Sequence, residues 1–447
     1  MTQYGYDITN PLAIENFAKQ LEGKCLADFM DTHSVDAENK GTFGNLVQTF
    51  LGIPVNSVPG ADFTTIGGAN VEVKSLPLRN TSKGLRVKER LVFNIIDYMS
   101  ICTEQWDTSS FLAKNRLLLL FMYIHEPNKT VYEYQIHSVC LLDLKNIPRE
   151  DLKIMQEDWE KIVSTVRNGE TENLSEGSTF YLGACTKGST AEKSYRKQPY
   201  SDILAKQRAF SWKTTYLNHV LEDICQSDKQ GHSIFGAYSG KMTFEQLVIS
   251  MFAPYVGMSA EDIAKALNKE YAAGTKHFLA LMSKAILGAA DTQDIQEFVN
   301  ADVTMKTICL EATGRLTESI SFPYIHYNEI IYEEWETSTL REMMDKKFFF
   351  VIFQKTASGQ RILRKAMFWN LPEEILENDV KKVWERTCEM IRDDRFDELP
   401  GMSWNPVCHV RPHARNSEDT AMTATGRAVV KKCFWLKNSF IRAQIEG

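Results

Sequence analysis

Asp62, Glu72 and Lys74 are the residues of this chain whose types and spacing best suit a chemical reaction. Residues 71–75 alternate as in a β-strand, which places Glu72 and Lys74 on one face. A turn at Gly67-Gly68 would return the chain so that Asp62 lies beside them. Two carboxylates can hold a hard divalent cation, and an amine can orient or deprotonate water. Together they are the minimum set for metal-assisted phosphodiester hydrolysis.

The same residues have a simpler interpretation, because Glu and Lys two residues apart are common on solvated strand faces. The segment that precedes these residues favours a catalytic site over a solvated strand face. Residues 40–52 predict an amphipathic helix ending at Gly52, with apolar residues spaced at i, i+3, i+4, i+7 and i+8: Phe43, Leu46, Val47, Phe50 and Leu51. Gln48 projects from the flank of this helix, just ahead of Asp62.

Bulk properties describe a globular protein of 447 residues, enough for two or three domains with their own cores. The longest apolar run, 117–124, predicts a buried strand and is too short to cross a membrane. Nine scattered cysteines and an N-terminus without a signal-peptide pattern favour the reducing cytoplasm. The net charge of −7 argues only weakly against nucleic-acid binding, because a local basic patch makes phosphate contacts.

A strand predicted at 179–188 opens into a polar loop that runs to Pro199 and suits a segment laid against DNA. Its candidate contacts are hydrogen-bond donors and one ring that could stack: Lys187, Ser189, Thr190, Lys193, Tyr195 and Arg196. The alternative is an exposed polar loop without a ligand. Residues 206–213, which include Arg208 as a further DNA candidate, are predicted to start the last helix of this half.

The second half repeats the first in order. Residues 276–288 match 40–52, 303–307 match 71–75, 334–338 match 105–109, and 348–353 match 117–123. Where the first half has Glu72 and Gln48, the second has Thr304 and Lys284, so it lacks an acid for a metal. It keeps a candidate DNA loop at 407–416, in which Arg411 and Arg415 suit guanine edges or phosphates.

These residues make the chain resemble the MutH-like branch of the PD-(D/E)xK nucleases, and within it the two-lobed GATC-specific type II (type IIE) restriction endonucleases. The resemblance covers most of the chain. It rests on blocks that occur in order: Asp62…Glu72-Val73-Lys74, Lys88-Glu89-Arg90-Leu91-Val92, Trp106-Asp107-Thr108-Ser109-Ser110-Phe111-Leu112, Gln198-Pro199-Tyr200-Ser201-Asp202-Ile203, Lys206-Gln207-Arg208-Ala209-Phe210-Ser211 and Cys408-His409-Val410-Arg411-Pro412-His413.

The resemblance implies an α/β (α+β) fold class: two tandem MutH/restriction-endonuclease-like domains, each a mixed central sheet flanked by helices. Asp62 and Glu72 are then expected to bind Mg²⁺. Lys74 would position the attacking water, and Lys88 would assist near the scissile phosphate. The family has an accessory glutamate where this chain has Gln48, and the spacing from Asp62 to Glu72 is longer than the family's usual one.

The same resemblance assigns Lys187 to the family's base-reading loop, and Arg411 and His413 to the corresponding loop of the second lobe. The expected organisation is a catalytic domain at 1–225, a linker at 226–240, and a DNA-binding effector domain at 241–447 without the catalytic acids. GATC is a palindrome and the chain offers one complete site. We therefore expect two chains to assemble on duplex DNA, each supplying one active site.

Two other functions are compatible with the sequence. One is a mismatch-repair nicking endonuclease of MutH type, although such an enzyme consists of one lobe. The other is a catalytically impaired GATC-binding protein, which Gln48 would favour because it removes a charge from the metal site.

Overall fold

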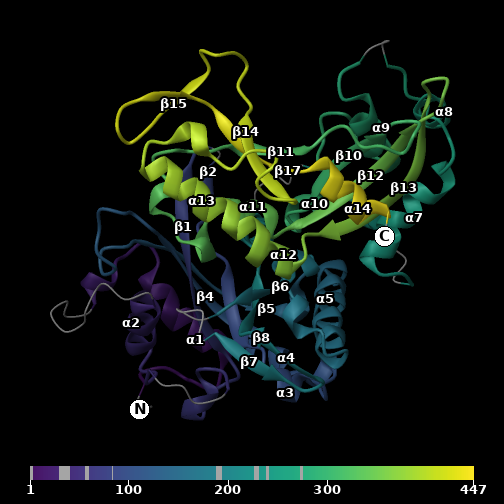
Figure 1. Cartoon of the computed structure of the whole chain (residues 1–447). Coiled ribbons are helices and arrows are strands. Elements are labelled where there is room, and N and C mark those ends of the chain that lie inside the picture. The colour runs from purple at the N-terminus through teal and green to yellow at the C-terminus, as the bar shows by residue number, and fades with distance from the viewer. Residues whose placement is uncertain are drawn as a thin grey trace. The chain divides into compact units, whose positions relative to one another are not determined.

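The computed structural model divides the chain into two compact units (Figure 1). It describes residues 4–29, 41–55, 60–82, 84–187, 194–225, 231–237, 241–271 and 275–446. Unit 1 comprises 1–172 and 179–229, and unit 2 comprises 173–178 and 230–447. The boundary falls inside the predicted linker, of which 226–230 and 238–240 lie outside the described residues.

Residues 173–178 belong to unit 2, although the sequence prediction placed them in the N-terminal domain. Asp345 Oδ1 accepts the backbone N–H groups of Glu176 at 3.1 Å and Gly177 at 3.3 Å. Lys347 Nζ donates to the carbonyl of Ser178 at 3.1 Å. This hexapeptide is therefore a correction to the predicted boundaries, since its polar backbone groups find their partners far away in the sequence.

The described part of unit 1 contains two larger sheets and the two-stranded β7-β8 hairpin. The first has the strand order β2-β1-β4-β5, and the second has the order β3-β9-β6. The strands are β1 Glu72–Thr81, β2 Gly84–Val87, β3 Leu91–Ile95, β4 Leu117–Ile124, β5 Ile136–Asp143, β6 Leu182–Thr186, β7 Tyr195–Gln198, β8 Ser201–Lys206 and β9 Arg208–Trp212. The helices are α1 Pro11–Ala18, α2 Thr42–Phe50, α3 Tyr98–Ile101, α4 Ser110–Asn115, α5 Arg149–Arg167 and α6 Thr214–Ile224.

The pairing of β1 with β4 positions the chemistry of unit 1. The two strands run parallel, and β4 pairs antiparallel with β5 on its other side. The apolar run of β4 is buried, as its composition predicts. Helix α2 packs its apolar face into the same core, in which Phe43, Val47, Phe63 and Phe121 meet. It ends before Gly52, whose φ of +75° fits the predicted cap position.

Three elements of unit 1 differ from the sequence prediction. The apolar spacing of residues 11–31 predicts one helix, but α1 ends at Ala18 and short 3₁₀ turns follow it. The basic, polar composition of 79–86 predicts a loop, but this segment contains the hairpin of β1 and β2. Residues 208–212 form the buried strand β9, and helix α6 begins only at Thr214. The alternation of β9 was hidden because all five of its side chains are buried.

Unit 2 has the strand orders β10-β12-β13 and β11-β17-β14, plus the β15-β16 hairpin (green to yellow in Figure 1). The strands are β10 Thr304–Leu310, β11 Ile320–Tyr324, β12 Lys347–Lys355, β13 Arg361–Asn370, β14 Cys408–Pro412, β15 Thr420–Met422, β16 Ala428–Val430 and β17 Lys432–Leu436. The helices are α7 Phe244–Phe252, α8 Ala260–Ala266, α9 Phe278–Ile286, α10 Gln296–Asn300, α11 Thr339–Met344, α12 Glu373–Ile375, α13 Lys381–Arg392 and α14 Asn438–Glu446.

The repeat predicted from sequence is present in the topology of the two units. β10 runs parallel to β12, which pairs antiparallel with β13, as β1, β4 and β5 do. Thr304 lies opposite Phe348 in the register in which Glu72 lies opposite Leu118. The helix before each central strand starts at a serine cap, Ser109 for α4 and Ser338 for α11. The fold class is therefore the mixed α/β arrangement that the sequence predicted.

None of the helices in the described part of the chain combines the length and the apolar character needed to cross a bilayer.

Candidate active site

Glu72 begins β1 and is the most buried acid of the predicted site, with a side chain only 4% exposed. Lys74 shares its strand face, and Lys74 Nζ lies 2.8 Å from Glu72 Oε1. Burial raises the pKa of Glu72, against the charge of Lys74, and the nearby charge of Asp62 raises it further. Further positive charge beyond that of Lys74 would therefore be favourable beside this carboxylate.

Asp62 lies against the start of β1, as the predicted turn requires. Its Oδ2 accepts the N–H of Val73 at 2.8 Å, and its own N–H donates to Glu72 Oε2 at 3.2 Å. The long spacing between the two acids is taken up by a 3₁₀ turn, Thr64–Ile66, and by Gly67, whose φ is +76°. The tertiary structure thus brings Asp62 and Glu72 together despite ten residues of separation.

Gln48, on α2, contacts the acid pair directly. Its Nε2 donates to Asp62 Oδ1 at 3.0 Å. The amide fixes the orientation of the Asp62 carboxylate without adding charge. A glutamate at this position would place a second negative charge against Asp62.

Lys114 is a site residue that the sequence interpretation missed. It lies in α4, and its Nζ is 3.5 Å from Glu72 Oε1, the oxygen that Lys74 also contacts. Two signals could have revealed it. Lys114 lies two residues after the Trp106–Leu112 block, and it precedes β4, whose N-terminal end meets that of the parallel strand β1.

Lys88 is not at the acid pair. Its N–H donates to the carbonyl of Pro77 at 2.8 Å, and its Nζ pairs with Glu89 at 2.8 Å. Pro77 lies five residues beyond Glu72 on β1, roughly 16 Å along the strand. A lysine side chain does not span that distance, so a role for Lys88 would have to be exercised further along a bound DNA strand.

The donor set fits a divalent cation. Asp62 and Glu72 supply hard carboxylate oxygens at one point, and the side-chain amide of Gln48 contacts Asp62 there. A cation there would also offset the cost of keeping Glu72 charged in a buried position. Within the described residues no group of three or more His, Cys, Asp or Glu side chains is arranged for a metal. The remaining ligands would therefore have to come from water or substrate oxygens.

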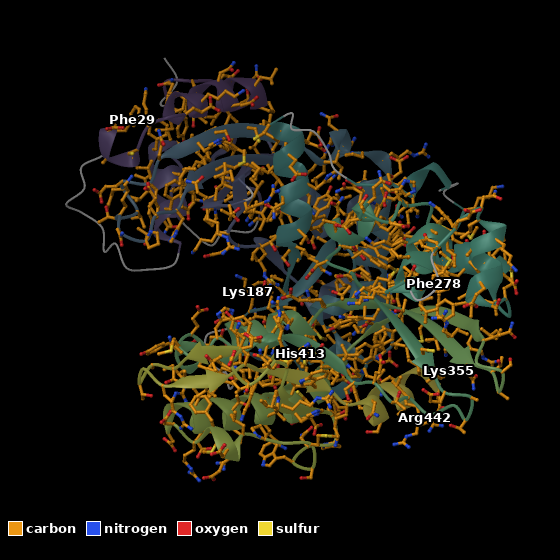
Figure 2. The ribbon with its side chains drawn as sticks, turned by 90° about the horizontal axis from the view of Figure 1, so that it is seen from above. Phe29, Lys187, Phe278, Lys355, His413 and Arg442 are labelled. Carbon is orange, nitrogen blue, oxygen red and sulfur yellow. The ribbon has the colours of Figure 1, made fainter. Side chains whose placement is uncertain are left out.

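The predicted DNA contacts of unit 1 fall into three groups. Lys187, at the end of β6, and Tyr195, on β7, are exposed (Figure 2 marks Lys187). Arg196 is exposed and its Nη2 donates to Gln207 Oε1 at 2.7 Å. Ser189, Thr190 and Lys193 lie outside the described residues.

Arg208 is a correction to the predicted DNA contacts. It is only 1% exposed, and its Nη1 donates to the carbonyl of Ala184 at 2.7 Å. The guanidinium therefore ties β9 to β6 from inside the unit, where DNA does not reach it.

In unit 2, the segment predicted as a DNA loop, 407–416, contains strand β14, and two of its candidate residues contact Trp435 of β17. The guanidinium of Arg411 lies 3.8 Å from the Trp435 ring centre, and the ring of His413 stacks on the same indole at 4.9 Å (His413 is marked in Figure 2). Arg415 is exposed, and its N–H donates to Asp419 Oδ2 at 3.1 Å. Arg411 and His413 are thus held in place, while the side chain of Arg415 projects into solvent.

Comparisons with known proteins agree with this geometry. Residues 51–158 match the family described as DNA mismatch repair enzyme MutH, and this segment contains Asp62, Glu72, Lys74 and Lys114. The type II restriction enzyme Sau3AI of Staphylococcus aureus is 28% identical over 97% of this chain and 98% of its own length. The DNA mismatch repair protein MutH of Shewanella oneidensis is 25% identical over 46% of this chain and 92% of its own length.

These matches define the class: the protein carries a MutH-like nuclease domain in its first half. Over nearly its whole length it is homologous to a type II restriction endonuclease, a site-specific deoxyribonuclease. The resemblance predicted from the sequence blocks is therefore confirmed at the level of a MutH-like restriction endonuclease.

Proposed function

We propose that this protein is a type II restriction endonuclease that cleaves duplex DNA at 5′-GATC-3′ by metal-dependent phosphodiester hydrolysis. The observation that carries the proposal is the contact of Asp62, Glu72, Lys74 and Lys114 at the start of β1. The GATC sequence itself is supported by the resemblance of the ordered blocks, which extend beyond the catalytic residues into both candidate DNA loops.

In this proposal Asp62 and Glu72 hold a Mg²⁺ ion, which when bound supplies positive charge to the oxygens of the scissile phosphate. Lys74 Nζ, anchored by Glu72, donates a hydrogen bond to the attacking water and so aims its lone pair at phosphorus. The water oxygen bonds to phosphorus as the bond to the 3′-oxygen breaks. The water loses a proton and the leaving oxygen gains one, which leaves 5′-phosphate and 3′-hydroxyl ends.

Lys114 adds a role that the sequence did not predict. Its ammonium lies on the same side of Glu72 as that of Lys74. When a phosphate displaces these contacts, Lys114 can donate to a non-bridging oxygen and balance the charge that grows there in the transition state.

Unit 2 is proposed to bind a second GATC site through the loop of Arg411, His413 and Arg415. Thr304 replaces the acid, so this unit reads DNA without cutting it. Because the palindrome has two scissile bonds and each chain has one acid–lysine site in its described part, two chains are proposed to act together on DNA.

The coverage of the relatives favours this function over a mismatch-repair nickase. Almost all of the Shewanella MutH aligns with less than half of this chain, whereas Sau3AI aligns with nearly all of it. A nickase of that type consists of one lobe and would not require unit 2.

The deciding experiment is cleavage of unmethylated supercoiled plasmids with zero, one or two GATC sites in Mg²⁺. Cutting of both strands at GATC, faster with two sites, is the expected result. Nicked circles alone would contradict the restriction activity. Binding of GATC duplex without cleavage in Mg²⁺ or Mn²⁺ would instead support the impaired binding protein that Gln48 suggests.

A further inference from the structure

The repeat assigns each catalytic position of unit 1 a counterpart in unit 2. Gln48 is the seventh residue of α2, and Lys284 is the seventh residue of α9. Gln48 contacts Asp62, ten residues before Glu72. Lys284 Nζ lies 3.1 Å from Asp294 Oδ1, ten residues before Thr304. The counterpart of the acid pair is thus an aspartate and a threonine.

The counterpart of Lys74 is a lysine, whereas the counterpart of Lys114 on α11 is a methionine, Met343. Lys306 lies opposite Phe350 in β12, in the register in which Lys74 lies opposite Leu120 in β4. Its side chain is partly buried, and no described residue forms a hydrogen bond or an ion pair with its Nζ. In unit 1, by contrast, Lys74 Nζ forms an ion pair with Glu72.

A further lysine stands close to Lys306. Lys346 directly precedes β12, and its Nζ pairs with Asp302 at 3.2 Å. Burial and the charge of Lys346 lower the pKa of Lys306. No acid opposes these two effects, so the positive charge of Lys306 is not compensated by a neighbouring carboxylate among the described residues.

The local charge balance of the two sites is therefore different. In unit 1 two acids, Asp62 and Glu72, meet the two lysines of the site. In unit 2 Lys284 pairs with Asp294 and Lys346 pairs with Asp302, which leaves Lys306 without an acid partner among the described residues. The charges of the first arrangement balance, whereas the second leaves the positive charge of Lys306, which attracts an anion.

We infer that the degenerate site of unit 2 binds a backbone phosphate of DNA directly, through Lys306 and Lys346 with the hydroxyl of Thr304 as a further donor. This inference rests on the proposed function, because it requires unit 2 to bind duplex DNA. In unit 2 the ammonium groups of the lysines contact the phosphate themselves. In unit 1 a metal ion held by the two acids would make that contact. DNA binding by unit 2 is consequently independent of divalent metal.

The test uses the full-length chain with Glu72→Gln, which prevents cleavage, in buffer with EDTA. Binding of a GATC duplex is followed by fluorescence anisotropy over a range of salt concentrations, with and without Lys306→Met. Loss of one phosphate contact should weaken binding several-fold and reduce the slope of log K against log salt by about 0.9. The matched control is Lys265→Met on α8, where the side chain is 80% exposed, and it should leave the slope unchanged.

A second measurement separates a contact from a folding defect. Methionine removes an uncompensated, partly buried charge, so the melting temperature of Lys306→Met should be equal to or above that of the parent. Acetylation of Lys306, followed by mass spectrometry of its peptide, should fall when GATC duplex is added to the parent chain, while Lys265 stays reactive.

Unchanged affinity and salt slope in Lys306→Met, together with an unprotected Lys306 in the DNA complex, would overturn this inference and leave the proposed function intact. Protection of Lys306 by inorganic phosphate but not by duplex would overturn its assignment to DNA. A Glu72→Gln chain that binds GATC duplex in Mg²⁺ but not in EDTA would overturn this inference alone. Absence of binding in both buffers would overturn both proposals, and this is visible before any Lys306 variant is made.

Discussion

Each unit contains two parallel strands and a helix that contacts the first of them: β1, β4 and α2 in unit 1, and β10, β12 and α9 in unit 2. The residues that begin β1 and β10 differ. In unit 1, β1 begins with buried Glu72, which gathers Lys74 and Lys114 around it. In unit 2, β10 begins with Thr304, and Lys306 is left without an acid. The first residue of the strand therefore decides whether the lysine two positions later pairs with an acid of the protein or is available to a ligand.

The acids at the flank of each site follow the same contrast. Asp62 is fixed by the N–H of Val73 and by Gln48, so both of its oxygens are oriented. Asp294 is 73% exposed and pairs with the ammonium of Lys284. The repeat has kept an aspartate at each flank, but only unit 1 orients it for a metal.

Loss of Glu72 is expected to have the largest effect. Glu72→Gln removes the charge that holds the cation and anchors Lys74, so DNA cleavage should fall by about 10³-fold or more. Plasmid cleavage at saturating enzyme measures this. Glu160→Gln, an exposed site on α5, is the control and should cleave normally. Retained GATC binding by Glu72→Gln would separate catalysis from recognition.

The same variant should not lose stability without metal. The pKa of Glu72 is raised in the folded chain, so its ionised form costs stability as the pH rises through that pKa. Glutamine resembles the protonated form. In EDTA at pH 7.5 the melting temperature should therefore equal or exceed that of the parent, and only the parent should gain on addition of Mg²⁺. Marked destabilisation of the variant would contradict the assigned cost of burial.

Unit 2 should respond to acid in the opposite way, through His409. Burial, with the charges of Arg411 and Lys437, lowers the pKa of His409 to about 4. Since the unfolded chain binds this proton near pH 6.5, stability is lost as the pH falls from about 6.5 to about 4, by about 3 kcal/mol at most. Hydrogen exchange of β14 peptides, corrected for intrinsic rates, should show this loss. His409→Gln should abolish it, and an unaltered pH response in that variant would refute the assignment.

Lys114→Met should lower cleavage by about 10²-fold, because it removes one of the two cations that contact Glu72. The informative comparison is Lys88→Met, which alters a lysine paired with Glu89 away from the acids. We expect the Lys88 variant to change binding or its salt dependence more than the cleavage step. Single-turnover rates and affinities separate the two effects. The reverse pattern would restore Lys88 as the assisting lysine.

Gln48→Glu should have the smallest effect. It tests whether a glutamate at the family's accessory position strengthens metal binding. A second carboxylate against Asp62 costs stability without metal and strengthens metal binding, so the half-saturating Mg²⁺ concentration should fall by about 3- to 10-fold. Lys284→Gln is the matching change in unit 2, and it should not create any metal requirement for DNA binding. Metal titrations of cleavage and binding test both.

The sequence by itself determined the local elements and the composition of the site. The alternation at 71–75 placed Glu72 and Lys74 on one face, and the spacing in 40–52 gave α2 and its cap at Gly52. The repeat was also readable, because strand and helix periods depend on neighbouring residues. The fold class followed from these elements and from the resemblance.

Only the tertiary structure decided which distant groups meet. The parallel pairing of β1 with β4 carries Lys114 to Glu72, and the packing of β9 against β6 buries Arg208. The backbone of 173–178 finds its partners on Asp345 and Lys347 in unit 2. Such contacts depend on strand register and on burial across many residues. A local pattern in the sequence therefore does not predict these contacts.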